Sequence, residues 1–232
     1  MNDILNLIKI RHSVRNFESY TLSHQEIKKI TAYIKDLPML DSKIQITWKI
    51  KHSSPLGSGK IYTEIPKQTS ENLVEYGFQG ENIVLFLTSL DFGTCWMAVG
   101  RATERLAPAV IVFGKQGSKN LYSHISRFVI SSNKRKSLTL LLEKTQCQPT
   151  PEQENILETM RAAPSAVNRQ PWLFEIQNEN KIIVKKTAGH AQWSWINLGI
   201  CLCHGYLMAK EIFEKVQVIR CEQEIYSIEY HQ

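Results

Sequence analysis

The chain has 232 residues, which suits one large domain or two closely packed halves, and 43% of the residues are hydrophobic, enough for a substantial core. No apolar run approaches the roughly 20 residues that cross a bilayer, because even the stretch 193–209 is interrupted by Asn197 and His204. The net charge of +6 is modest, and the basic residues are scattered except for residues 134–136, with no interleaved aromatic residues. These features exclude a membrane-spanning protein and argue against a nucleic-acid partner.

The N-terminal residues lack the basic stretch, apolar segment and small-residue cleavage site of a signal peptide, so we expect a cytoplasmic protein. Five cysteines are an odd number, and none are spaced as CxxC, so we expect reduced thiols. Cys201 and His204 would share one face of a helix, but a second pair of ligands is missing. We therefore expect no metal site.

The first third of the chain predicts two helices and a strand. Apolar residues over 3–8 indicate a short helix that leads into the polar loop RHSVR. Ser23, followed three residues later by Glu26, has the pattern of a capping box, and isoleucines at helical spacing extend that helix toward Pro38. The alternating segment IQITWKI predicts a strand.

Residues 51–67 are rich in Ser, Gly and Pro, and we interpret them as a surface hairpin or loop. The segment SSPLGSGK superficially resembles a phosphate-binding P-loop. It fails as one because Ser54 stands where the first glycine is needed, and Ile61 stands where a magnesium-binding hydroxyl is needed.

The remaining pattern runs through the same cycle twice. Residues 71–89 predict a buried helix, DFGTCW a turn, and PAVIVF a strand covered on both faces. After Pro149 come a proline-led helix, strands at WLFEIQ and KIIVKK, a long apolar helix over 193–213 and a final strand at IYSIEY. We therefore predict an α+β fold built from two halves, 1–148 and 149–232, related by gene duplication.

Two polar segments are candidates for binding chemistry. The first places Arg11, His12, Ser13 and Arg15 directly after a helix. Two forked, permanently charged guanidiniums with a nearby hydroxyl can clamp a phosphate. The alternative is a solvated basic turn, which short charge clusters usually form.

The second candidate segment is APSAVNRQPWLFEI, residues 163–176. Two prolines restrict its backbone, and Ser165, Asn168 and Gln170 offer neutral donors and acceptors of the kind that meet the edge of a heterocycle. The alternative is a helix end that feeds a strand, with Asn168 satisfying loose backbone groups.

RHSVRNF and APSAVNRQPWLF together resemble the FMN-dependent nitroreductase family, which carries an RxSxR-like element and a PSxxNxQPWxF element. In ordinary members both elements lie in one subunit, and FMN sits at a homodimer interface. Here the first element occurs only in the front half and the second only in the back half, where the front half has LPMLDSKIQITWKI instead. This arrangement resembles the subfamily in which two nitroreductase-like halves form a single-chain pseudo-dimer that retains one site.

The resemblance implies one FMN site made by both halves. It assigns the phosphate and ribityl end to Arg11, His12, Ser13 and Arg15, with Arg135 and Lys136 as further phosphate candidates, and the flavin ring to Pro164, Ser165, Ala166, Asn168 and Gln170. The helix ending in DFGTCW would place Gly93, Thr94, Cys95 and Trp96 near the isoalloxazine. A nucleophilic or redox role for Cys95 is less favoured than that of a small buried residue, because no base adjoins it.

The implied activity is hydride transfer from NAD(P)H through FMN to a nitroaromatic, quinone or other electrophile, with the flavin in place of catalytic side chains. One alternative is a protein that binds FMN without turnover, and another is a degenerate scaffold that no longer binds flavin. The fused halves make a monomer sufficient, while homodimerisation, the choice of NADH or NADPH and the physiological acceptor stay open.

Overall fold

The computed structural model describes residues 4–52, 57–98, 106–117, 135–143, 147–187 and 192–232. In the front half, two helices precede two strands, a long helix and two further strands. They are α1 (Ile4–Ile10), α2 (His24–Lys35), β1 (Lys49–Lys51), β2 (Gly59–Tyr62), α3 (Ser70–Ser89), β3 (Gly93–Ala98) and β4 (Ala109–Gly114).

The back half repeats this succession. It is preceded by the short helix α5 (Leu138–Leu141) and contains α6 (Pro151–Ala162), the short 3-10 turn η2 (Ala166–Asn168), β5 (Trp172–Asn178), β6 (Lys181–Lys186), α7 (Trp193–Ile212), β7 (Lys215–Glu222) and β8 (Ile225–His231).

Two four-stranded antiparallel sheets have the same strand order. The first runs β1-β2-β4-β3 and the second β5-β6-β8-β7, so each places its four strands in the order first, second, fourth, third. In both, the long helix lies in sequence between the second and third strands. The prediction of an α+β fold with two related halves is therefore confirmed.

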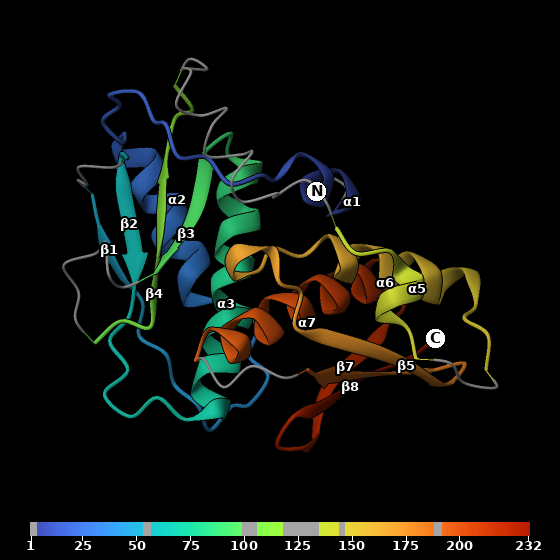
Figure 1. Cartoon of the computed structure of the whole chain (residues 1–232). Helices are drawn as coiled ribbons and strands as arrows, with labels where there is room; N and C mark the ends of the chain where they lie inside the picture. Colours follow the sequence, from blue (N-terminus) through green and yellow to red (C-terminus); the bar gives the residue numbers. More distant parts are fainter. Residues whose placement is uncertain (1–3, 53–56, 99–105, 118–134, 144–146, 188–191) are drawn as a thin grey trace.

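The two long helices cross between the sheets (Figure 1). The crossing is close because each helix presents a glycine to the backbone of the other. A Cβ on Gly77 would lie 2.1 Å from the Ile196 carbonyl oxygen, and a Cβ on Gly199 would lie 1.9 Å from the Val74 carbonyl oxygen. Each glycine thus meets the residue three positions before the other glycine, which is the pattern of a local two-fold relation.

The helices that precede the sheets begin as their sequences predict. Ser23 accepts a hydrogen bond from the Glu26 backbone N–H, and the Glu26 side chain accepts one from the Ser23 backbone, which completes the capping box of α2. Thr150 and Gln153 form the neutral counterpart at α6, with Pro151 in the first turn. Both helices therefore begin with a capping box.

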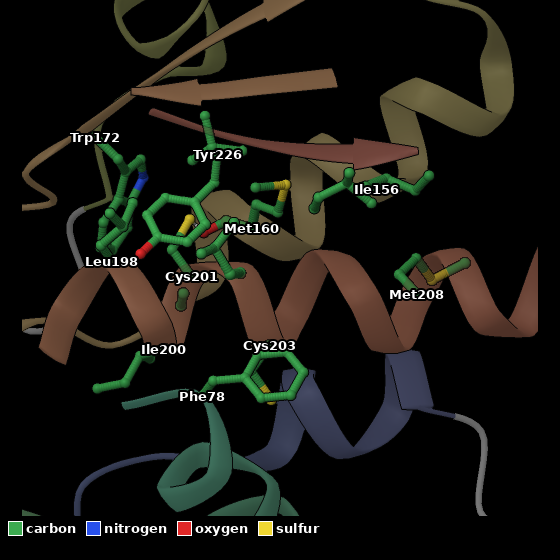
Figure 2. Close-up of a cluster of buried hydrophobic side chains, with 14 of the residues drawn as sticks. Phe78, Ile156, Met160, Trp172, Leu198, Ile200, Cys201, Cys203, Met208 and Tyr226 are labelled. Carbon is green, nitrogen blue, oxygen red and sulfur yellow. Dashed lines mark hydrogen bonds between the residues drawn. The ribbon is translucent and has the colours of Figure 1, made fainter. Parts of the chain in front are cut away.

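The main core surrounds α7 (Figure 2). One side of the helix packs toward the second sheet, where Cys201 lies near Trp172 and Tyr226, and the other side packs toward Phe78 of α3. Burial on both sides explains why this segment is apolar nearly throughout, with no single hydrophobic stripe. A second cluster joins α2, α3, β2 and β4.

Three predictions for local structure need correction, and one strand was missed. The strand expected over IQITWKI is confined to Lys49–Lys51 within the described part of the front half. Residues 51–67, expected to form a surface hairpin or loop, do contain the second strand of a hairpin, since β1 and β2 pair antiparallel, but β2 is buried between β1 and β4 rather than on the surface. DFGTCW turns only at its start, where Asp91 has a φ of 58°, and continues as β3 along the apolar strand β4. Strand β7 was not predicted, since it is a mostly exposed edge strand.

No helix in the described ranges is long and apolar enough to cross a membrane. Within the same ranges no three potential metal-ligating side chains come together.

Candidate functional site

The RHSVR segment lies along the start of β3. Ser13 and Thr94 form an isolated parallel bridge, and the Val14 N–H donates to the Thr94 carbonyl oxygen over 2.9 Å. Gly93 permits this approach, because a Cβ there would lie 2.7 Å from a methyl carbon of Val14. Two segments that the sequence separates by about 80 residues, both predicted to belong to the site, are therefore side by side.

Arg11 is the partly buried cation of the segment. Its Nε is shielded from solvent and has no hydrogen-bond partner within the described residues. Burial lowers the pKa of Arg11, and the nearby Glu81 and Cys95 oppose that shift. A buried guanidinium nitrogen without an acceptor is costly, so its position is suited to an anionic or acceptor-rich ligand.

His12 and Arg15 are exposed. The His12 ring contacts the Ile10 carbonyl oxygen at 3.0 Å and the Gln116 side-chain oxygen at 3.1 Å. Arg15 makes no hydrogen bond or ion pair within the described part of the chain. The predicted clamp therefore consists of one buried and one exposed arginine, and the phosphate role of Arg15 stays a prediction.

The loop after α6 is strained and tightly held. Val167, Asn168 and Gln170 have φ values of 48°, 56° and 47°, a region that non-glycine residues rarely adopt and β-branched residues least of all. Ser165 supports the turn from within, since its Oγ accepts from the Gln170 N–H at 2.9 Å and its carbonyl accepts from the Asn168 N–H at 2.9 Å. Such conformations cluster at binding sites, because the surrounding structure has to impose them.

The long helix α7 forms a hydrogen bond with the same loop. Asn197 Oδ1 accepts a hydrogen bond from the Ala166 N–H at 3.0 Å. Pro164, two residues earlier, is buried, and Ala166 is partly exposed. Gln170 is fully buried, and its side-chain nitrogen donates to the Arg161 carbonyl oxygen at 3.1 Å.

Arg135 and Lys136 bind this loop, while their role at a phosphate stays a prediction. The Arg135 guanidinium donates to Asn168 Oδ1 and, over 3.1 Å, to the Ala162 carbonyl oxygen. Lys136 donates from its backbone N–H to Gln170 Oε1 at 2.8 Å and from Nζ to the Gln170 carbonyl at 3.2 Å. Each of the two basic residues therefore bonds both a side chain and a backbone carbonyl of the segment 162–170.

Arg11 of the front segment affects the pKa of Arg135, which is bound to the back loop. Burial, and to a lesser extent the neighbouring Arg11, lowers the pKa of Arg135 to about 10, against the opposing effect of Glu81. Arg11 comes from the front half and Arg135 follows the first sheet in sequence, bound to the loop of the back half. Glu81 in turn accepts a hydrogen bond from Trp96 of β3.

The four predicted residues of DFGTCW all lie in β3. Thr94 and Cys95 are buried, and the Cys95 thiol donates to the Trp96 carbonyl oxygen at 3.4 Å. The Trp96 indole N–H donates to Glu81 Oε2 at 2.8 Å, and its ring lies against Gly80, where a Cβ would be 2.3 Å away.

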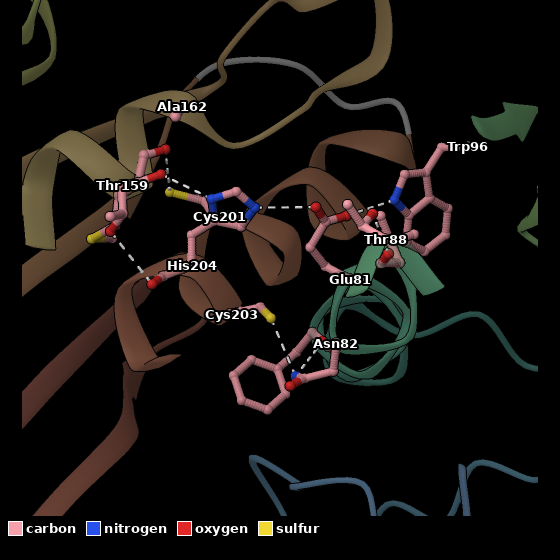
Figure 3. A network of polar contacts seen from close by, with 12 residues as sticks. Glu81, Asn82, Thr88, Trp96, Thr159, Ala162, Cys201, Cys203 and His204 are labelled. Carbon is pink, nitrogen blue, oxygen red and sulfur yellow. Dashed lines mark hydrogen bonds and ion pairs between the residues drawn. The ribbon is translucent and has the colours of Figure 1, made fainter. Parts of the chain in front are cut away.

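Glu81, His204 and Asn197 were not recognised from the sequence. Glu81 and His204 are both fully buried and contact each other at 3.1 Å between Oε1 and Nε2 (Figure 3). An acid in the middle of a helix predicted to be buried was the available signal, because a buried charge needs a partner. His204 was considered only together with Cys201, whose thiol instead donates to the Met160 carbonyl at 3.8 Å.

Comparison with known proteins identifies the family. The model of the family described as "Putative TM nitroreductase" matches residues 3–209. The chain belongs to this family. A crystal structure of a putative nitroreductase from Thermotoga maritima is 32% identical, covers 99% of this chain and 94% of its own, and has a TM-score of 0.81.

More distant structures are similar over part of the chain. A putative nitroreductase in complex with FMN from Desulfovibrio desulfuricans is 16% identical over 63% of this chain and 99% of its own, with a TM-score of 0.45. A nitroreductase with bound FMN from Desulfitobacterium hafniense is 15% identical over 52% of this chain and 92% of its own, with a TM-score of 0.42. No curated protein matches the chain.

Proposed function

We propose that the protein binds one FMN at this site and acts as an NAD(P)H oxidoreductase whose electron acceptor is a nitroaromatic, a quinone or another small electrophile. The observation that carries the proposal is the buried Nε of Arg11, which has no hydrogen-bond partner among the described residues and belongs to the segment that pairs with β3. Arg135, bound to the strained loop, adds a second cation, and the charge of Glu81, which His204 already contacts, raises the pKa of both guanidiniums. That excess of positive charge suits an anionic ligand.

The residues present fit a flavin nucleotide. Arg11 Nε is a buried donor with no hydrogen-bond partner among the described residues, and the loop after α6 supplies neutral polar groups beside Arg135. FMN combines a phosphate with a heterocycle that requires such neutral donors and acceptors. When bound, FMN would accept hydride from one substrate and deliver it to the next.

The side chains have different roles in this proposal. The negative charge of the cofactor is bound by Arg11, Arg135 and Lys136. Trp96 of β3 is a candidate for contact with the flavin ring. Gln170 uses both side-chain polar atoms within the protein, since Oε1 accepts from Lys136 and Nε2 donates to the Arg161 carbonyl. We therefore assign Gln170 to holding the loop, rather than to the direct ring contact that the resemblance implied.

One chain contributes both segments of the site, so we propose that a monomer is sufficient, with the two halves in the place of two subunits. The buried Cys95 thiol donates to a backbone carbonyl. This contact supports a packing role, and the proposed chemistry does not use the thiol.

The first test is an absorbance spectrum of the purified protein after addition of excess FMN and desalting, followed by anaerobic addition of NADH or NADPH. We expect retained flavin whose visible absorbance bleaches. Retained flavin that stays oxidised would favour a binding protein without turnover, and absence of retained flavin would contradict the proposal.

A matched pair of variants locates the site. Arg11→Met removes the buried cation while it preserves side-chain bulk, and we expect FMN affinity to fall at least about tenfold, which corresponds to about 1.4 kcal/mol. Arg169→Met removes an exposed arginine within the loop after α6, its side chain turned to solvent, and should leave the dissociation constant within about twofold. Equal effects of the two variants would indicate a general response to net charge rather than a site at Arg11.

A further inference from the structure

The loop after α6 contains a run of left-handed residues that begins at Val167. This residue has a φ of 48° and a ψ of 27°, and Asn168 and Gln170 also have positive φ values. The left-handed region is unfavourable for residues other than glycine, and a β-branched side chain makes it more so. Packing does not offset that cost, since Val167 is 67% exposed. The conformation is therefore imposed by contacts made elsewhere in the loop.

Some of these contacts are local, and one comes from the core. The Asn168 N–H donates to the Ser165 carbonyl oxygen, and the Gln170 N–H donates to Ser165 Oγ, each over 2.9 Å. Both bonds stay within the loop. The bond from the Ala166 N–H to Asn197 of α7 is made before the left-handed run begins. None of these bonds ties a left-handed residue to another element.

The contacts that do so come from Arg135 and Lys136, which we call the clip. Arg135 donates to Asn168 Oδ1 and, over 3.1 Å, to the Ala162 carbonyl oxygen, so one guanidinium joins the end of α6 to the middle of the loop. Lys136 donates from its backbone N–H to Gln170 Oε1 at 2.8 Å and from Nζ to the Gln170 carbonyl oxygen at 3.2 Å. The clip therefore spans the left-handed run.

The equivalent loop of the front half lacks this strain. Leu40 corresponds to Ala166, since each donates its N–H to a side chain two residues before the glycine of the crossing. Asp41 therefore takes the place of Val167. Asp41 has no positive φ, and its Oδ1 accepts from the Lys43 N–H at 2.9 Å, which supports the turn locally. Of the two loops, the strained one is the loop that the clip binds.

We propose that Arg135 is a positioning residue, which holds the loop after α6 in the left-handed conformation that the cofactor site requires. This inference rests on the proposed FMN site and adds to the cationic role of Arg135 there. Without the clip, Val167 would favour an ordinary backbone conformation, and only a fraction of the molecules would present the loop in its binding form. The apparent affinity for FMN falls in proportion to that fraction.

A glycine at position 167 separates positioning from direct charge. Glycine adopts positive φ without steric cost, and Val167→Gly removes none of the hydrogen bonds of the loop. We expect Arg135→Met to weaken FMN binding about tenfold, and Val167→Gly alone to stay within about twofold of the wild type. In the Arg135→Met background, Val167→Gly should recover at least about threefold of the loss, because the loop no longer has to be held. Absence of any recovery would overturn the inference, since Arg135 would then act only through its charge.

Hydrogen exchange provides a readout that needs no cofactor. In FMN-free protein, Arg135→Met should lower the protection of the Gln170 N–H at least about tenfold, and adding Val167→Gly should restore part of it. Unchanged protection in Arg135→Met would also overturn the inference. Failure of the wild-type protein to bind FMN would instead contradict the proposed function, and the exchange experiment would still test the clip.

Arg169→Met is the matched control, because it removes the same charge from an exposed side chain of the loop itself. We expect both FMN affinity and Gln170 N–H protection to stay within about twofold of the wild type. Losses equal to those of Arg135→Met would overturn the inference. If Arg135→Met gives no cooperative urea transition, Lys136→Met, which removes only the Nζ contact to the Gln170 carbonyl, takes its place in the same cycle with the same expected recovery.

Discussion

The loops that follow α2 and α6 occupy equivalent places but carry opposite chemistry. In the back half, the Ala166 N–H donates to the neutral side chain of Asn197 at 3.0 Å. In the front half, the Leu40 N–H donates to the carboxylate of Glu75 at 3.0 Å, and the Asp41 N–H adds a bond of 3.2 Å. Asn197 and Glu75 each lie two residues before the glycine of the crossing.

The backbones of the two loops differ as well. Positive φ values at non-glycine residues occur in the loop after α6, whereas none occurs over residues 37–44, all of which are described. A carboxylate that gathers backbone N–H groups satisfies the front loop internally, while the back loop is bonded to Arg135 and Lys136. The comparison shows that the two halves share their packing, while basic residues bind the loop of the back half and a carboxylate binds the loop of the front half.

The largest expected effect tests what the halves share. Gly77→Ala and Gly199→Ala would each place a methyl group about 2 Å from a backbone oxygen of the other helix. We expect each substitution to lower the free energy of unfolding by about 3 kcal/mol or more, because backbone cannot yield as a side chain does. Urea unfolding of the two variants measures this, and a marked difference between them would break the equivalence of the halves.

Much of the fold could be predicted because its signals are local. The capping residues Ser23 and Thr150 and the apolar run of β4 define their elements without help from distant contacts. Strand β2 could not be recognised, since its Gly-Lys-Ile-Tyr sequence is short, and its strand state depends on pairing with β1 and β4. Strand β7 could not be recognised either, because it is a mostly exposed edge strand and therefore lacks a continuous apolar face.

The site was predictable only in part. Segments with a dense polar pattern, such as RHSVR and PSAVNRQ, were recognised, and the structure brings both toward Arg135. The difference between Arg11 and Arg15 depends on which side chain turns inward, and that is decided by pairing with β3. Glu81 and His204 are far apart in the chain, and only the helix crossing shows that they form a pair.

The difference between the two loops can be tested by exchanging the polar residues that bind them, Asn197 in the back half and Glu75 in the front half. Asn197→Asp keeps the acceptor for the Ala166 N–H and adds the negative charge that the front half has at Glu75. We expect FMN affinity to fall at least about tenfold, because the new charge opposes an anionic ligand. Titration of FMN fluorescence measures the change.

The reciprocal variant is the control for this exchange. Glu75→Gln makes the front loop neutral while it retains an acceptor for the Leu40 N–H, and FMN affinity should stay within about twofold. The wild-type protein should bind one FMN per chain. Two FMN per chain, or equal losses in both variants, would show that the two loops are not distinct in the way proposed.

The smallest expected effect concerns the pH dependence contributed by Glu75. Burial raises its pKa above the ordinary value of 4.5 for a glutamate, against the lowering effect of Gln79 and of the loop N–H groups. The folded protein therefore holds this proton to higher pH than the unfolded chain does, so the associated stability is present below about pH 4.5 and is lost as pH rises through the folded pKa. Urea midpoints of wild type and Glu75→Gln between pH 4 and 7 should change relative to each other, with the wild type losing ground as pH rises. A constant difference would mean that the loop N–H groups fully compensate the burial of the carboxylate, and the front loop would then be as well suited to a negative charge as the back loop is to a neutral amide.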